Sequence, residues 1–213
     1  MYLPAGKERL LKVFFQDPWA ELHQRELSRQ AKVPIQNTHK YLNEFVEDGL
    51  LLRREVSNMT FFQPHWESAH LLKIFELFEV SQREGFLARN KSIARLLAQA
   101  TEILVKKSKS HVQLVMLFGS VARGTWTPKS DIDLLVLASS PGSTINNALA
   151  EAKTAAQSVL ELSPVFTTIE AATAGFRERR AFHQEVWGNR VVLYNEFLFW
   201  QIVKRGMPHG STA

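Results

Sequence analysis

The sequence predicts an α+β protein of two domains. Amphipathic segments followed by a pair of strands occupy the first third of the chain, a helical stretch follows, and two strongly apolar strands come after residue 111. At 213 residues the chain is long enough for two small domains. We divide it into a first domain at 1–66, a helical linker at 67–110, a second domain at 111–196 and a C-terminal tail at 197–213.

Composition and charge are those of an ordinary globular protein, with 45% hydrophobic and 22% charged residues. The absence of cysteine excludes disulfide frameworks and thiolate metal sites. No signal peptide or long apolar run is evident, so we expect a soluble, cytoplasmic protein with no membrane partner. The net charge is +5, with most of the excess in 67–110, so any nucleic-acid contact must depend on individual residues.

The first domain is predicted to contain three short helices and a hairpin. The helices are expected at 6–16, 22–31 and 35–49. Gly49 stands where a helix C-cap commonly lies. The third helix should face inward with Ile35, Leu42, Phe45 and Val46. Strands at 50–56 and 59–63 should pair across the turn-prone Ser57 and Asn58.

This order of elements over 6–63 resembles a winged helix-turn-helix, and the resemblance implies DNA binding. The start of the third helix carries polar side chains suited to base edges in a major groove, namely Gln36, Asn37, Thr38, His39, Lys40 and Asn43. The hairpin would contact phosphates or the minor groove through Arg53, Arg54 and Asn58. This domain is nearly charge-neutral, so an ordinary helical domain, or a winged helix that contacts protein, stays open as an alternative.

The linker 67–110 has apolar residues at three- and four-residue spacing, including Leu71, Leu72, Phe75 and Phe78. Such a stripe packs either within the chain or against a second subunit. Because winged-helix regulators often read two half-sites, we expect a homodimer.

In the second domain, two aspartates interrupt an apolar strand. Asp131 and Asp133 are two residues apart, so their side chains point to the same face of the strand. There they repel each other, and each raises the pKa of the other unless a divalent cation lies between them. The pair therefore predicts a site for Mg²⁺ or Mn²⁺.

The preceding strand runs into a small-residue turn at Gly119 and Ser120. Glycine allows the backbone to approach a ligand closely, and Ser120 with the amides after it can hold phosphate oxygens. Positive charge for the same anion is available nearby. The predicted nucleotide-binding residues are Gly119, Ser120, Arg123, Lys129 and Ser130.

Along the chain, the whole pattern consists of a strand, the pair Gly119-Ser120, ten further residues, and an Asp-x-Asp motif within a second strand. It resembles the signature of the minimal nucleotidyltransferases of the DNA polymerase β superfamily, closely over 111–137 and more loosely to 196. The resemblance implies a mixed sheet flanked by helices that binds NTP, with ATP expected, together with a divalent metal. It also implies transfer of a nucleotidyl group to a hydroxyl, with Asp131 and Asp133 holding metal and Gly119 and Ser120 holding the triphosphate.

One feature departs from the family, whose active members carry a third carboxylate on a later strand. Here that strand is 162–171, and Phe166 occupies the position aligned with the carboxylate. Glu161, at the start of the strand, is a better substitute than Glu170, so Asp131, Asp133 and Glu161 are the candidate catalytic residues. Loss of a general base typically costs 10²–10⁴-fold in rate, so catalysis stays open while nucleotide binding does not depend on this residue.

Three functions are compatible with the sequence. In the first, the chain is a DNA-binding regulator with an active nucleotidyltransferase that modifies a small molecule or a partner protein, as modifying antitoxins do. Alternatively it is an inactive regulator that senses nucleotide, or a plain interaction module. The paired aspartates beside Gly-Ser argue against the third function, and the departure at Phe166 leaves the first two close. We favour a DNA-binding regulator with a nucleotidyltransferase-fold domain and leave its catalytic activity open.

Overall fold

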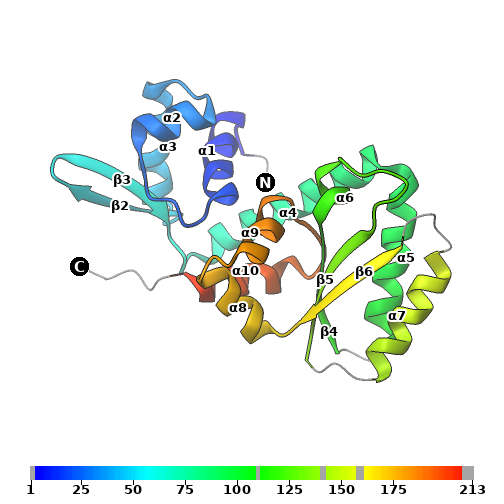
Figure 1. The fold of residues 1–213 in the computed structure, drawn as a ribbon. Helices are drawn as coiled ribbons and strands as arrows, with labels where there is room; N and C mark the ends of the chain where they lie inside the picture. The colour runs from blue at the N-terminus through cyan, green and yellow to red at the C-terminus, as the bar shows by residue number, and fades with distance from the viewer. Residues whose placement is uncertain (1–2, 109–110, 140–142, 157–160, 208–213) are drawn as a thin grey trace. The chain divides into compact units, whose positions relative to one another are not determined.

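The computed structural model describes residues 3–108, 111–139, 143–156 and 161–207 (Figure 1). The chain forms two compact units, Met1–Phe78 and Glu79–Ala213, whose boundary falls inside helix α4 (Ala69–Arg89). Within the described residues, no helix is long and apolar enough to cross a membrane.

The first unit combines short helices with a three-stranded sheet of order β1-β3-β2. Its elements before α4 are α1 (Ala5–Gln16), β1 (Leu22–His23), α2 (Gln24–Ala31), α3 (Ile35–Glu47), β2 (Leu51–Val56) and β3 (Met59–Pro64). Ser57 and Asn58 have φ of 45° and 65°, as in the two-residue turns whose twist matches that of the strands they join. The predicted helices and hairpin are present, but the start of the second helix is corrected. Leu22 and His23, predicted to be helical, form β1, and α2 begins at Gln24.

The core of the first unit lies between its helices, where Leu10, Phe14, Leu27, Leu42 and Phe45 are each at most 1% exposed. The expectation for Ile35 is wrong, because this side chain is 43% exposed. Ile35 is the first residue of α3 and follows Pro34 at the N-cap, so it lies beyond the edge of the core that the rest of the helix covers.

The second unit is a mixed four-stranded sheet of order β6-β5-β4-β7 with helices on both sides (Figure 1). After α4 its elements are α5 (Lys91–Lys107), β4 (Val112–Phe118), α6 (Gly119–Arg123), β5 (Ile132–Ala138), α7 (Ser143–Ala156), β6 (Leu162–Thr167), α8 (Ile169–Arg177), α9 (Ala181–Gly188), β7 (Val191–Tyr194) and α10 (Glu196–Gly206). β4 is antiparallel to β5 and β7, whereas β5 is parallel to β6. The α+β class and the mixed sheet are confirmed.

Alternate residues of the central strands face different helical layers. Val115, Leu117, Leu134 and Val136 join the core cluster that contains apolar residues of α5 and α7. The register partners Met116 and Leu135 therefore face the other side, where α8 and α10 contact the sheet (Figure 1). Asp133 lies two residues before Leu135 in the same strand, so its side chain points to this second face as well.

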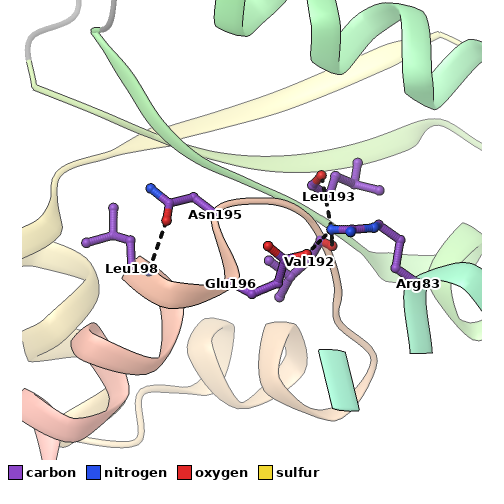
Figure 2. Close-up of polar contacts among 6 residues, drawn as sticks. All are labelled: Arg83, Val192, Leu193, Asn195, Glu196 and Leu198. Carbon is purple, nitrogen blue, oxygen red and sulfur yellow. Dashed lines mark hydrogen bonds and ion pairs between the residues drawn. The ribbon is translucent and has the colours of Figure 1, made fainter. Parts of the chain in front are cut away.

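The predicted boundary at 197, between the second domain and a C-terminal tail, is wrong. The segment from 197 to Gly206 is helical. It belongs to α10, because Phe199, Trp200, Ile202 and Val203 are fully buried. Asn195 caps this helix, accepting the Leu198 N–H on its side-chain oxygen at 3.1 Å (Figure 2). Residues 208–213 lie outside the described part of the chain.

Arg83 joins the second half of α4 to the β7–α10 segment. Its Nη1 donates to the carbonyl oxygens of Val192 at 3.1 Å and Leu193 at 3.4 Å, and it forms an ion pair with Glu196 (Figure 2). Because β7 is the edge strand beside β4, these contacts to its backbone carbonyls attach α4 to that edge of the sheet.

A buried ion pair makes a second connection, between α4 and the short segment that joins α9 to β7. Arg190 donates from Nε to Glu79 Oε1 at 2.7 Å, and the two residues are 4% and 0% exposed. The guanidinium carbon lies 3.9 Å from the ring centroid of Trp187, whose carbonyl accepts from Arg190 Nη1 at 3.0 Å. Arg190 therefore ties α4 to the C-terminal end of α9.

Candidate functional site

The turn between β4 and α6 depends on Gly119. Its φ of +72° lies in the left-handed region that residues with a side chain rarely adopt. A Cβ at this position would lie 2.1 Å from Asp133 Oδ2, so there is also no space for one. Gly119 thus brings the backbone of the turn directly against the Asp133 carboxylate.

Gly119→Ala is expected to destabilise the protein and to displace the Asp133 side chain. The positive φ alone costs about 1–2 kcal/mol for a residue with a Cβ, and the overlap with Asp133 adds to that cost. Gly124→Ala is the matched control, because Gly124 has a φ of +75° but a Cβ there would meet nothing within 4 Å. Chemical denaturation should give a larger loss for Gly119→Ala, and equal losses would show that the approach of Gly119 to Asp133 has no energetic consequence.

The two predicted aspartates lie at the start of β5, close enough for the charge of Asp131 to act on Asp133. Asp131 is exposed and directly precedes the strand, and Asp133, partly buried, is the register partner of Phe118. Burial raises the pKa of Asp133, the charges of Asp131 and Glu185 raise it further, and Arg123 opposes the rise. The site therefore holds a carboxylate whose ionised form is disfavoured in the protein alone.

The predicted phosphate-binding residues come from two segments, α6 and the turn that precedes Asp131. Ser120 is partly buried in α6, and its carbonyl accepts the Thr125 N–H at 3.0 Å. Arg123, exposed at the end of α6, donates from Nη1 to Glu185 Oε1 at 3.2 Å. Its charge acts on Asp133, so the turn and this arginine flank the same carboxylate.

Lys129 and Ser130 lie in the turn that leads into Asp131. The Ser130 hydroxyl accepts the Thr127 N–H at 2.9 Å, and the Lys129 N–H donates to Thr127 Oγ1 at 3.3 Å. Both contacts fix the backbone of the turn, while the Lys129 side chain is exposed. Lys129 is thus held close to the aspartates by its backbone, with its ammonium group accessible to a ligand.

Strand β6 carries no carboxylate on the face of Asp133. The register pairs Asp133 with Ser163 and Val136 with Phe166. Phe166 packs against the core cluster on the opposite face, so the position aligned with the family's third carboxylate does not point toward Asp133. Glu161 is exposed just before β6, and its carbonyl accepts the Ile132 N–H at 2.7 Å, which puts it at the same end of the sheet as Asp131.

Glu185 is the site residue that sequence reasoning misses. It lies on α9, far along the chain from the aspartates, and reaches the site because Phe182 packs edge-on against Phe118 with ring centroids 5.5 Å apart. The residues around Glu185 form no motif, so only the packing of α9 against the end of β4 reveals it.

The predicted DNA-binding residues on α3 are exposed except for two. Asn43 is partly buried, and its amide nitrogen lies 3.2 Å from His39 Nε2. Thr38 is fully buried, and its hydroxyl donates to the Val33 carbonyl at 3.2 Å. Thr38 is therefore corrected from a surface residue to one that fixes the turn before α3. The exposed residues are Gln36, Asn37, His39 and Lys40.

On the hairpin, both predicted arginines already pair with carboxylates. Arg53 pairs with Glu55, and Arg54 donates to both carboxylate oxygens of Glu21, at 2.5 Å each. Asn58 is exposed at the turn. Any phosphate contact by these arginines would have to replace an existing carboxylate partner.

A divalent metal fits the chemistry of the paired aspartates. Among the described residues no group of three or more His, Asp or Glu side chains is arranged to hold a metal ion. Mg²⁺ is nevertheless commonly bound by one or two carboxylates, with waters and substrate phosphates as its other ligands. Asp131 and Asp133 supply such a pair, and a cation between them would remove the repulsion that raises the Asp133 pKa.

The second unit combines a mixed sheet, a glycine turn after β4 and a pair of aspartates at the start of β5. Residues 97–187, which run from within α5 to within α9, match the family model for a nucleotidyltransferase domain. No curated protein and no solved structure matches the chain. The family match supports nucleotidyl transfer as the general class of activity, and it includes every candidate residue of the second unit, Glu185 among them.

Proposed function

We propose that the second unit binds a nucleoside triphosphate with Mg²⁺ or Mn²⁺ and transfers its nucleotidyl group to a hydroxyl, with ATP as the expected donor. The observation that carries this proposal is the position of Asp133 directly against Gly119, with Asp131 close enough for its charge to act on Asp133, within the matched residues. A carboxylate whose ionised form is disfavoured by burial and by a neighbouring charge is costly in a site without a cation, and useful in one that binds a metal with a triphosphate.

The proposed chemistry forms one bond and breaks one. The acceptor oxygen bonds to the α-phosphorus, the bond from that phosphorus to the bridging oxygen breaks, and pyrophosphate leaves. The acceptor proton passes to a carboxylate, for which Glu161 remains our candidate. Bound metal would neutralise the charge on the leaving phosphates. Ser120, Arg123, Lys129 and Ser130 would contact phosphate oxygens.

Labelled nucleotide distinguishes nucleotidyl transfer from the alternatives. The protein is incubated with Mg²⁺, candidate acceptors and ATP labelled in either the α- or the γ-phosphate. We expect label from the α-position alone to appear in the acceptor, and the Asp131→Ala/Asp133→Ala variant to transfer none. Transfer from the γ-position would indicate a different reaction and overturn the proposal.

Ser163 favours a second candidate, a regulator that senses nucleotide without catalysis. Because Ser163 occupies the β6 position opposite Asp133, the strand provides no base there. Metal-dependent nucleotide binding without α-label transfer to any acceptor would support this candidate. Transfer to one partner protein would instead indicate an antitoxin-like modifier.

We also propose that the first unit binds DNA and that the chain acts as a homodimeric transcription regulator. The exposed polar side chains at the start of α3 support this, with Lys40 as a cation for phosphate. In fluorescence anisotropy at low salt, Lys40→Ala should weaken binding to all sequences and reduce the salt slope by about 1. Lys12→Ala, which removes a lysine from α1, is the control. Absence of any DNA binding by the wild type at low salt would contradict this part of the proposal.

A further inference from the structure

Helix α9 holds a carboxylate at the edge of the nucleotide site. Val186 of this helix is fully buried, and Phe182 packs against Phe118, the residue before Gly119. The helix also packs tightly on α8, where a Cβ on Gly175 would lie 2.0 Å from the His183 ring. The position of Glu185 next to the turn is therefore set by packing on both sides of α9.

Glu185 pairs with Arg123, the cation at the end of α6 whose charge acts on Asp133. Its Oε1 accepts from Arg123 Nη1 at 3.2 Å, and the Glu185 and Arg123 side chains are 51% and 37% exposed. Half-exposed ion pairs contribute little net free energy, so this pair can be exchanged for a stronger one. Arginine binds phosphate through charge-assisted hydrogen bonds that are stronger than neutral ones.

The consequence for a triphosphate is a competition between two anions for one guanidinium. A phosphate that contacts Arg123 must replace the Glu185 carboxylate, and it also experiences the negative charge of Glu185. In the protein without nucleotide, Arg123 pairs with Glu185 and its charge acts on Asp133.

We propose that Glu185 is a positioning residue that holds Arg123 in the nucleotide-free protein and yields it to the phosphates of the bound nucleotide. This inference rests on the proposed function, because it assumes that Arg123 contacts the triphosphate. Glu185 therefore sets the affinity of the site for nucleotide through Arg123, although no sequence motif links these two residues.

The test is a double-mutant cycle in the full chain, with Mg²⁺–ATP binding measured by calorimetry. Glu185→Gln removes the competing charge and should tighten binding about two- to fivefold, the range that an exposed ion pair allows. In the Arg123→Ala background, the same substitution should increase the logarithm of the affinity by less than half as much. Glu178→Gln is the matched control, since it removes an equally exposed glutamate that pairs with Arg180 at 2.8 Å, and it should leave the affinity unchanged.

A gain in affinity is a readout that loss of a merely structural contact would not give. If the wild type binds nucleotide but Glu185→Gln binds equally or more weakly, the inference is wrong and the proposed function stands. A full gain in the Arg123→Ala background also overturns it, because Glu185 would then act without Arg123. If the wild type binds no nucleotide at all, the proposed function itself fails and this inference fails with it. Thermal unfolding of each variant confirms that the domain is folded.

Discussion

Glu79→Ala is expected to lower the free energy of unfolding of the second unit by about 3–5 kcal/mol, the cost of removing one partner from a buried ion pair. Arg190 would remain almost fully buried without the Glu79 carboxylate. Its contacts with the Trp187 carbonyl and with the rings of Trp187, Phe199 and Trp200 provide hydrogen bonding and packing but carry no full negative charge. Chemical denaturation followed by tryptophan fluorescence measures the loss.

Two variants define what the loss means. Glu84→Ala removes an exposed glutamate from the same helix and should change the free energy of unfolding by no more than about 0.5 kcal/mol. Glu79→Leu combined with Arg190→Met replaces the pair by apolar side chains and should recover most of the stability lost in Glu79→Ala. A loss below about 1 kcal/mol in Glu79→Ala would show that the buried pair does not hold α4 to the sheet.

Asp133→Asn is expected to change stability and metal-dependent binding in opposite directions. Burial and the charge of Asp131 raise the Asp133 pKa, so the ionised side chain destabilises the protein without metal. The neutral amide should therefore stabilise the metal-free protein, by less than about 1 kcal/mol because the side chain is only partly buried. The same substitution removes a proposed metal ligand and should weaken Mg²⁺-dependent nucleotide binding at least about 100-fold.

The pH dependence checks the sign of this effect. Because the folded-state pKa of Asp133 is raised, the folded protein binds more protons than the unfolded chain between the ordinary and the raised pKa. The stability advantage of Asp133→Asn should then be fully present above the raised pKa and disappear as the pH falls through that window. Nucleotide binding with Mg²⁺ should weaken over the same window in the wild type. An Asn variant that is less stable than the wild type at neutral pH would contradict the account.

The features that the sequence predicts well are those fixed by neighbouring residues. The hairpin follows from two strands and the Ser57-Asn58 turn, whose positive φ values suit a tight connection. Local spacing likewise predicts a glycine turn after one strand and an aspartate pair at the next. The approach of Gly119 to Asp133 depends in addition on the antiparallel register, which places Phe118 opposite Asp133.

The features that the sequence does not predict depend on register and tertiary packing. A shift of one residue along a strand exchanges its faces, which is why Phe166 lies in the core while Ser163 faces the Asp133 side. The sequence suggests that Thr38 is a polar surface residue, yet it is buried, because its hydroxyl donates a hydrogen bond to the Val33 carbonyl. Glu185 reaches the site only through the packing of α9, and a periodic pattern cannot show which distant helix covers a strand end.

The most direct test of the central claim is a calorimetric titration of ATP, GTP, CTP and UTP into the full chain, with and without Mg²⁺. We expect at least one nucleotide to bind in a Mg²⁺-dependent manner, and the Asp131→Ala/Asp133→Ala variant to lose that binding while it stays folded. Glu151→Ala, which removes an exposed glutamate on α7, should bind as the wild type does. If no nucleotide binds in the presence of Mg²⁺, or if the double variant binds as tightly as the wild type, then Asp131 and Asp133 are not the centre of a nucleotide site and the proposed function is wrong.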